Sequence, residues 1–271
     1  MNKQNAQQRI INIIQSLADE KRDQLEVLKQ RYPHEWERPD FIWHSLVSAF
    51  STMGGSAGSK GLIENKENYN SITFEALSKI DHAKRVAQVQ ETMYNANVRW
   101  PNRKASYLVQ NFEKIVKMGG LISARDQLEN SSGKEGKIRF LKSFAGISDK
   151  YARDIMMDVY HPEFRDSIAV DIRIQKISDE LGLQFENYAD HEFFYVDSAH
   201  RAGLNGWEID RLLYNYNTEV ISLLRSDKTQ STFKTDILNE KLKHRIVILE
   251  SKVADLQNQL DQLSELIEKQ V

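Results

Sequence analysis

The segment from Lys134 to Arg153 combines basic side chains with a tight glycine turn, an arrangement suited to binding phosphate groups. It holds six basic and two acidic side chains, a local charge of +4. Ala145–Ser148 predicts a turn between a helix over Lys137–Phe144 and a second helix over Asp149–Tyr160. The first N–H groups of a helix lack partners and the helix dipole adds positive charge there, so the turn favours an anion. We expect a nucleic-acid backbone at this hairpin.

Five residues of the hairpin are the candidates for contact with the DNA backbone. They comprise the backbone of the turn and two flanking side chains: Gly146, Ile147, Ser148, Lys142 and Arg153. The same spacing also fits an ordinary pair of packed helices with a solvated basic face. The residues alone leave both interpretations open.

The composition excludes several kinds of chemistry. The 271 residues include no cysteine, so disulfides, cysteine zinc sites, iron–sulfur clusters and thiol nucleophiles are impossible. The seven histidines lack the spacing of a metal site, and the glycine-rich Ser51–Ser59 lacks the lysine–serine pair of a P-loop. We therefore expect no metal and no cofactor. With a net charge of −2, the chain must hold any nucleic acid through a local patch.

Apolar residues recur at helical spacing through most of the chain and predict an all-α protein of about ten helices. The polar Ser226–Thr232 predicts a linker between a globular domain, 1–230, and a C-terminal helix, 231–271. No signal peptide and no run of about 18 apolar residues is present. We therefore expect no membrane segment and a cytoplasmic location, at the nucleoid if the source is bacterial.

The C-terminal helix carries a heptad seam, with leucine at d positions and mostly β-branched residues at a. Its apolar residues step alternately by four and three: Leu242, Ile246, Leu249, Val253, Leu256, Leu260, Leu263 and Ile267. Such a narrow seam favours a two-stranded parallel coiled coil and hence a homodimer. The alternatives are a helix that lies on its own domain and a coiled coil with another protein.

Two motifs resemble the helix-hairpin-helix DNA glycosylase superfamily, which includes endonuclease III and the 8-oxoguanine DNA glycosylases. Phe144–Ala152 (FAGISDKYA) resembles its hairpin, and Ile168–Arg173 (IAVDIR) resembles the segment that follows it, in the same order and at a similar separation. Phe41–Thr52 and Arg103–Phe112 resemble its early core helices more loosely. The resemblance implies a two-part, all-helical glycosylase fold, here followed by the coiled-coil helix.

The resemblance places Lys150 on the superfamily's lysine nucleophile and Asp171 on its catalytic aspartate. A lysine in the first turn of a helix, desolvated by an occupied pocket, would have a lowered pKa and a neutral amine able to attack C1′ of a deoxyribose. A carboxylate opposite it would stabilise the cationic sugar and assist proton transfers. The resulting Schiff base leads to β-elimination, so the lysine implies AP-lyase activity. Asp171 also has the position of an N-cap for a helix over Ile172–Leu181.

The sequence departs from the superfamily in three places. Ser148 replaces the second glycine of the hairpin, so this position loses the freedom to adopt a positive φ, and we expect a weaker phosphate contact. His161–Asp166 lengthens the segment between the two catalytic residues. The absence of cysteine excludes the cluster of the endonuclease III branch, which points to the 8-oxoguanine branch.

An extruded base needs aromatic or apolar surfaces and a few hydrogen-bonding groups. Four residues are the candidates for this base pocket: Trp43, His44, Trp207 and Tyr214. Each also suits an ordinary core position. Ser51–Ser59 is the candidate loop to fill the space that the base leaves.

These observations predict a bifunctional DNA glycosylase and AP lyase. It would bind double-stranded DNA, extrude a damaged and oxidised base such as 8-oxoguanine, and act through Lys150 and Asp171. The alternative is a non-catalytic dimeric DNA-binding protein that uses the hairpin for backbone contacts, or an adaptor that recruits another protein through its coiled coil. A pure binding protein needs no amine opposite a carboxylate, so the pair favours the enzyme.

Overall fold

The computed structural model describes residues 3–31 and 33–226 and the single positions 246, 249, 252 and 257. The chain divides into two compact units, 1–217 and 218–271. The predicted boundary at residue 230 and most of the heptad seam lie outside the described residues. Ile246 and Leu249 of the seam are helical and about half exposed. Dimerisation through this seam stays a prediction.

The described residues form helices and no strand, as the apolar spacing predicts. The helices are α1 (Lys3–Arg31), α2 (Pro33–Trp36), α3 (Phe41–Thr52), the π-helix η1 (Ser59–Ile63), α4 (Lys66–Ser71), α5 (Phe74–Ser78), α6 (His82–Asn95), α7 (Pro101–Lys117), α8 (Leu121–Glu129), α9 (Gly133–Lys142), α10 (Asp149–Asp158), the 3-10 helix η2 (Pro162–Phe164), α11 (Ile172–Glu180), α12 (Tyr188–Arg201) and α13 (Gly206–Asn215). Residues 217–226 are also helical. Helices α2, α4 and α5 have only four to six residues, too few for apolar periodicity to predict them. None of the described helices combines the length and apolarity that a membrane span requires.

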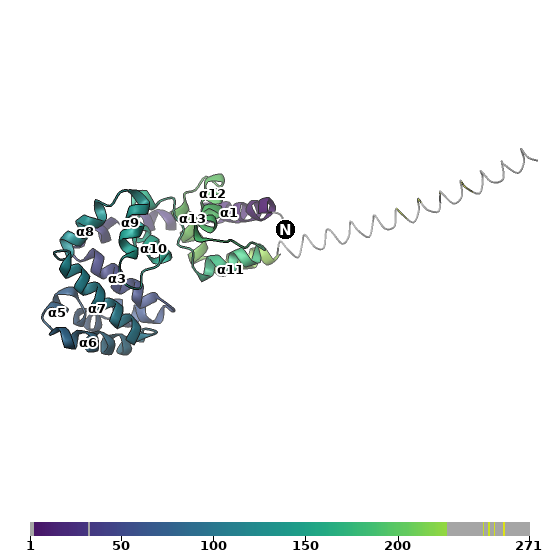
Figure 1. Cartoon of the computed structure of the whole chain (residues 1–271). Coiled ribbons are helices and arrows are strands. Elements are labelled where there is room, and N and C mark those ends of the chain that lie inside the picture. Colours follow the sequence, from purple (N-terminus) through teal and green to yellow (C-terminus); the bar gives the residue numbers. More distant parts are fainter. Residues whose placement is uncertain are drawn as a thin grey trace, which may run out of the picture. The chain divides into compact units, whose positions relative to one another are not determined.

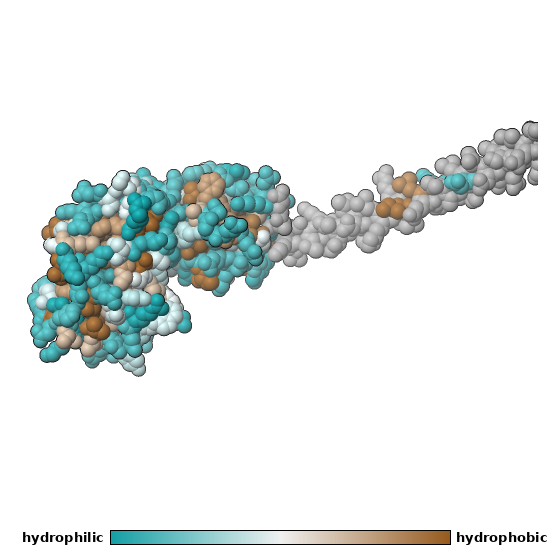
Figure 2. All heavy atoms as spheres, in the orientation of Figure 1, coloured by the Kyte–Doolittle hydropathy of each residue, from teal (hydrophilic) through white to brown (hydrophobic). Residues whose placement is uncertain are grey.

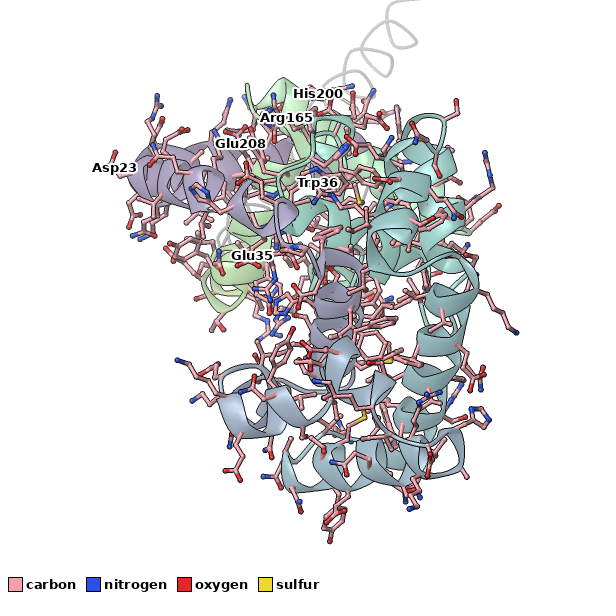
Figure 3. All side chains as sticks on the ribbon, turned by 90° about the vertical axis from the view of Figure 1, so that its left-hand side faces the viewer. Asp23, Glu35, Trp36, Arg165, His200 and Glu208 are labelled. Carbon is pink, nitrogen blue, oxygen red and sulfur yellow. The ribbon has the colours of Figure 1, made fainter. Side chains whose placement is uncertain are left out.

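Two groups of helices build the unit 1–217 (Figure 1). In the first group, α6 packs on α7, and α3 contacts α7, α8 and α10. In the second group, α1 packs on α12 and α13, and α13 also contacts α11. Glu208 of α13, which is labelled in Figure 3, pairs with Lys29 of α1 at 2.7 Å. The chain crosses from the first group to the second between α10 and α11, and these two helices begin next to Lys150 and Asp171.

Each group has a fully buried tryptophan, and neither indole exposes any surface. Trp43 of α3 packs edge-to-face on Phe74 and donates its N–H to the carbonyl of Ile72 at 2.9 Å. Trp207 of α13 donates its N–H to the carbonyl of Met157 at 2.8 Å. A buried indole N–H needs such a partner, because its desolvation is otherwise uncompensated. Figure 2 shows hydrophilic residues over most of the visible surface of this unit.

A buried lysine closes the end of α3. Lys104 of α7 donates from Nζ to the carbonyls of Phe50 (2.7 Å) and Met53 (2.6 Å), and the residue is 1% exposed. The last carbonyls of a helix have no partner within it, so this amine supplies the missing donor. Burial, together with the charge of Arg99, lowers the pKa of Lys104 to about 8. The amine therefore fixes the start of the glycine-rich Ser51–Ser59 against α7.

Replacement of Lys104 by methionine should lower the free energy of unfolding by about 1–3 kcal/mol, because two buried carbonyls lose their donor. Chemical denaturation measures this change. Lys114→Met is the matched control, since Lys114 lies on the same helix but donates to a single carbonyl, that of Ser143, at the surface. The control should lose about 0.5 kcal/mol or less. Equal losses in both variants would show that Lys104 does not stabilise the end of α3.

Candidate active site

The predicted hairpin forms between α9 and α10, although α9 begins earlier than predicted, at Gly133. Its turn is fixed by Asn111 of α7, which donates to the carbonyl of Ala145 at 3.0 Å and accepts from the N–H of the same residue at 2.7 Å. Gly146 has a φ of +83°, and a Cβ at this position would lie 2.7 Å from the ring of Tyr107. The turn therefore requires glycine at this position.

Ser148 occupies the second glycine position of the hairpin without strain. Its φ of −97° and ψ of 177° are extended backbone that any residue adopts. The lost freedom for a positive φ therefore does not strain the turn, and the weaker phosphate contact stays a prediction. The N–H of Ile147 is used within the turn, where it donates to the carbonyl of Phe144 at 3.2 Å. Among the described residues, the N–H groups of Gly146 and Ser148 form no hydrogen bond, so they can donate to a phosphate oxygen, as can the first N–H groups of α10.

Several basic side chains of the predicted patch pair with carboxylates of the protein itself. Arg153 is 6% exposed and pairs with Glu192 of α12 at 2.8 Å, so its assignment to the DNA backbone is wrong. Lys134 pairs with the same carboxylate at 2.9 Å, and Lys137 is buried. Lys142 lies at the surface of the hairpin, where it pairs with Asp149 at 2.6 Å, and it remains a candidate contact. Pairing with α12 could not be read from the local charge, because α12 is distant in the sequence.

Lys150 lies in the first turn of α10, as predicted, and its ammonium contacts a carboxylate of the same helix. Its Nζ is 2.7 Å from Oδ2 of Asp154 and 4.2 Å from the centre of the Tyr151 ring. Burial acts to lower the pKa of Lys150, but the charge and hydrogen bond of Asp154 outweigh it, with further contributions from Tyr151 and Asp171. The pKa of Lys150 is therefore raised in the protein without DNA, and the lowered pKa expected for an occupied pocket stays a prediction. The resting site holds an ammonium.

Asp171 caps the beginning of α11, as predicted. Its Oδ1 accepts from the N–H groups of Arg173 (2.8 Å) and Ile174 (3.1 Å), and its Oδ2 lies 3.2 Å from the Arg173 guanidinium. That guanidinium also lies over the ring of Tyr214, 4.1 Å from its centre. The charge of Asp171 acts on Lys150, so the two residues share one electrostatic environment.

Three side chains hold the extended segment that leads to Asp171. The N–H groups of Ile168–Val170 donate, in chain order, to Glu192 (3.3 Å), Asp210 (2.9 Å) and the Tyr188 hydroxyl (2.9 Å). The Tyr188 hydroxyl donates in turn to the first carbonyl of the segment at 2.8 Å. Because consecutive amides have side-chain partners, the segment has a fixed conformation and sets the position of Asp171.

A buried carboxylate, Asp210 of α13, belongs to the same cluster. Burial raises its pKa to about 7 against the opposing charge of Arg211, and the charges of Asp154 and Asp171 contribute to the rise. A carboxylate that titrates near neutrality, close to a lysine and two further carboxylates, is typical of a functional site.

Several residues of this cluster were not predicted from the sequence. Asp154 follows Lys150 by four residues, so their contact on one helix face could have been read from the spacing. Tyr188, Glu192 and Asp210 come from other helices and carry no local signal, because only the fold brings them to the segment before Asp171.

The predicted base pocket does not form as a unit. Trp43 and Trp207 are fully buried and their indole N–H groups bind backbone carbonyls, so the prediction that they contact a base is wrong. Both belong to the core, which the sequence could not distinguish from a pocket. His44 is mostly buried, with Nδ1 at 2.9 Å from the Tyr69 hydroxyl. Tyr214 alone among the four is substantially exposed, at 45%, beside the arginine that pairs with Asp171.

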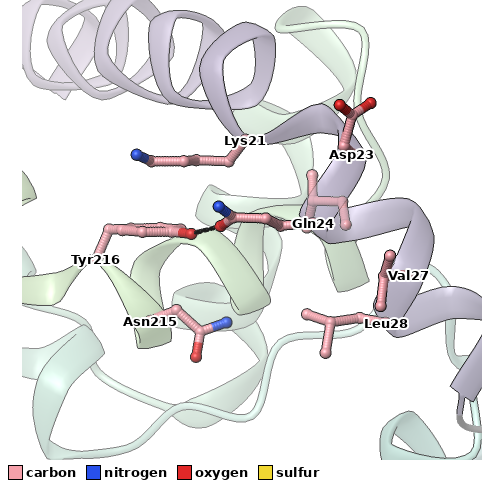
Figure 4. Close-up of a pocket in the computed structure, with 8 residues that line it drawn as sticks. Lys21, Asp23, Gln24, Val27, Leu28, Asn215 and Tyr216 are labelled. Atoms are coloured by element: carbon pink, nitrogen blue, oxygen red, sulfur yellow. Dashed lines mark hydrogen bonds between the residues drawn. The ribbon is translucent and has the colours of Figure 1, made fainter.

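An open pocket of about 430 Å³ lies between α1 and the end of α13 (Figure 4). It is lined by Lys21, Asp23, Gln24, Leu25, Val27, Leu28, Asn215 and Tyr216. The Tyr216 hydroxyl donates to the side-chain carbonyl of Gln24, and the Lys21 ammonium lies 5.0 Å from the centre of the Tyr216 ring. Apolar walls with an aromatic ring and two side-chain amides suit a planar polar ligand. None of the predicted base-pocket residues lines it.

Replacement of Tyr188 by phenylalanine should loosen the segment before Asp171. The variant removes one acceptor and one donor, so it should lose about 1 kcal/mol of stability and exchange the amide protons of Ile168–Val170 faster. Denaturation and hydrogen exchange measure both effects. Tyr195→Phe is the matched control, because its hydroxyl on the same helix bonds to Ser178 instead. Faster exchange of Ile168–Val170 in the control, or none in Tyr188→Phe, would argue against this role.

Comparison with solved structures identifies the fold of the chain. No family model and no curated protein matches the chain. The 8-oxoguanine DNA glycosylase of Thermotoga maritima is similar in structure, with a TM-score of 0.59 and 14% identity over 78% of this chain and 96% of that one. The 8-oxoguanine DNA glycosylase of Methanocaldococcus jannaschii has a TM-score of 0.58 and 16% identity over 80% and 96% of the two chains. A second structure from that organism, the glycosylase/lyase in complex with a 15mer DNA containing 8-oxoguanine, has a TM-score of 0.56 and 16% identity over 74% and 93%. The chain has the all-α fold of the 8-oxoguanine DNA glycosylases.

Proposed function

We propose that this protein is a DNA glycosylase and AP lyase that removes an oxidised purine, with 8-oxoguanine as the first candidate, from double-stranded DNA. The observation that carries the proposal is Lys150 in the first turn of the hairpin helix, acted on by the charge of the N-cap carboxylate Asp171. The similar structures support the substrate class, since their names describe 8-oxoguanine glycosylases and one of them is bound to DNA containing that base.

In the proposed reaction, the Lys150 amine attacks C1′ of the damaged nucleotide and the base leaves with the electron pair of its glycosidic bond. The carboxylate of Asp171 stabilises the positive charge that develops on the sugar. The covalent adduct becomes a Schiff base, and loss of a proton from C2′ then breaks the bond to the 3′ phosphate. Strand cleavage follows from the amine nucleophile, because water in its place would give excision alone.

The hairpin is the proposed anchor for the DNA backbone. The N–H groups of Gly146 and Ser148, with the N-terminus of α10, supply donors for a phosphate, and Lys142 adds a charge at the surface. Helix α10 contacts α3, and Thr52 at the end of α3 acts on the hydroxyl of Tyr151, so the start of the glycine-rich Ser51–Ser59 lies beside the hairpin helix. That position supports the proposal that this loop fills the space left by the base. The pocket at Tyr216 offers the aromatic wall and amides that an extruded base requires.

Borohydride should trap the wild-type protein on a duplex that contains 8-oxoguanine, and Lys150→Ala should abolish the adduct, because reduction fixes only a Schiff base. Gel electrophoresis of the covalent product measures it. Lys142→Ala is the control for loss of a positive charge on the hairpin: it should weaken binding and still form the adduct. Undiminished trapping by Lys150→Ala would assign the nucleophile to another amine, with Lys104 the first to test because its pKa is lowered to about 8.

Asp171→Asn should excise the base about 10²-fold more slowly or worse, because it loses the charge that stabilises the sugar cation. Its stability should stay near that of the wild type, because asparagine caps a helix about as well as aspartate. Asp171→Ala should lose the charge and about 1 kcal/mol from the missing cap. Single-turnover excision and denaturation separate the two roles. Excision by Asp171→Asn at the wild-type rate would leave Asp171 only its capping role.

A further inference from the structure

Lys150 and Asp154 form a hydrogen-bonded ion pair at the centre of the site. They lie one helical turn apart on α10, with Nζ 2.7 Å from Oδ2, and both side chains are only about a quarter exposed. Within the described part of the chain, the Lys150 ammonium is the recorded hydrogen-bond partner of Asp154. The two groups are therefore already at the distance that proton transfer requires.

The neighbouring carboxylates are committed to other partners. Asp171 accepts from two backbone N–H groups and faces a guanidinium, so protonating it would weaken the cap of α11. Asp210 accepts from a backbone N–H of the segment before Asp171. Asp158, one turn beyond Asp154, pairs with Arg211 of α13 at 3.0 Å. Asp154 is the carboxylate whose recorded partner is the amine itself.

We propose that Asp154 accepts the proton that Lys150 must lose to become a nucleophile, a step that rests on the function proposed above. The N–H bond of the ammonium breaks and its proton moves to Oδ2 of Asp154. The freed electron pair of nitrogen forms the bond to C1′, and the base leaves with the pair of the glycosidic bond and takes a proton from solvent. Asp171 takes no part in this proton transfer and faces the sugar cation.

This division of roles resolves a conflict in the resting site. An ammonium cannot attack carbon, yet the surrounding carboxylates hold Lys150 in that form. The groups that act on its charge are Asp154, Asp158 and Tyr151 on α10 and Asp171 before α11, with Asp210 and Arg211 of α13 coupled to them. Transfer over a single hydrogen bond frees the amine without moving any backbone, and the neutral acid remains beside the nitrogen.

The test uses the full-length protein, Asp154→Asn, and a duplex with a preformed abasic site, which isolates the amine chemistry from base recognition. The readout is the rate of borohydride-trapped adduct between about pH 6 and about pH 9. Near neutral pH the variant should be about 10²-fold slower, because asparagine cannot accept a proton. The deficit should shrink as the pH rises, because solvent then deprotonates an amine that no longer has its carboxylate partner.

Asp126→Asn is the control for removal of one carboxylate, since Asp126 lies exposed on α8 and is not among the groups that act on the charge of Lys150. It should react within about threefold of the wild type at every pH. A deficit of Asp154→Asn that is constant across the pH range would indicate a purely structural role and overturn the proposal, as would wild-type rates throughout.

A second measurement needs no DNA and separates this proposal from the proposed function. The pH dependence of acylation of Lys150, followed by mass spectrometry of the labelled peptide, reports when its amine is neutral. Asp154→Asn should move the midpoint of labelling to lower pH. An unchanged midpoint would overturn the proposal even if the wild-type protein excises bases. A shifted midpoint without any trapping on DNA would overturn the proposed function instead, and the proton-transfer step with it.

Discussion

The arrangement of the active site depends on one buried carboxylate. Glu192 of α12, 7% exposed, accepts from the guanidinium of Arg153, the ammonium of Lys134 and the N–H of Ile168. A lone buried carboxylate would be strongly unfavourable, but two cations and an amide offset its desolvation. Arg153 follows Lys150 by three residues, and Ile168 precedes Asp171 by three. Glu192 therefore binds both α10, which carries Lys150, and the segment that leads to Asp171.

Because several cations of the hairpin pair within the protein, the hairpin offers less positive charge to DNA than its sequence suggests. Lys134, Lys137 and Arg153 are all drawn into pairs within the protein, so the local charge of +4 overstates what reaches a phosphate. The groups left at the surface are backbone N–H groups of the turn, the exposed Arg139, and Lys142, which pairs with Asp149. Amides at a helix N-terminus fix the position of one phosphate, whereas a field of lysines would attract DNA without a preferred register. The proposed function requires one nucleotide to be placed over Lys150, and in a protein with a net charge of −2 the first arrangement suits that task.

The parts of this site that could be predicted from the sequence are those fixed by local structure. The hairpin follows from Gly146 between two apolar-periodic segments, and the cap of α11 follows from an aspartate directly before it. The rest depends on contacts between distant segments: sequence spacing could not place Trp43 and Trp207 in the core, nor Arg153 against α12. The conformation of Ser148 could not be predicted for another reason. A glycine in a motif does not reveal which φ it uses, and here the second position is extended backbone.

The charge state of Lys150 connects the resting structure to the proposed chemistry. Three carboxylates near one ammonium repel one another, and the pKa of Asp210, raised to about 7, reflects that repulsion together with burial. In the proposed reaction, one positive charge leaves the lysine nitrogen and another develops at C1′ of the sugar. The site therefore moves a positive charge over a short distance instead of creating one, and Asp171 faces it before and after, while Asp154 takes up the proton. Fixed charges that need no rearrangement stabilise a transition state most effectively, because the folding of the protein has already oriented them.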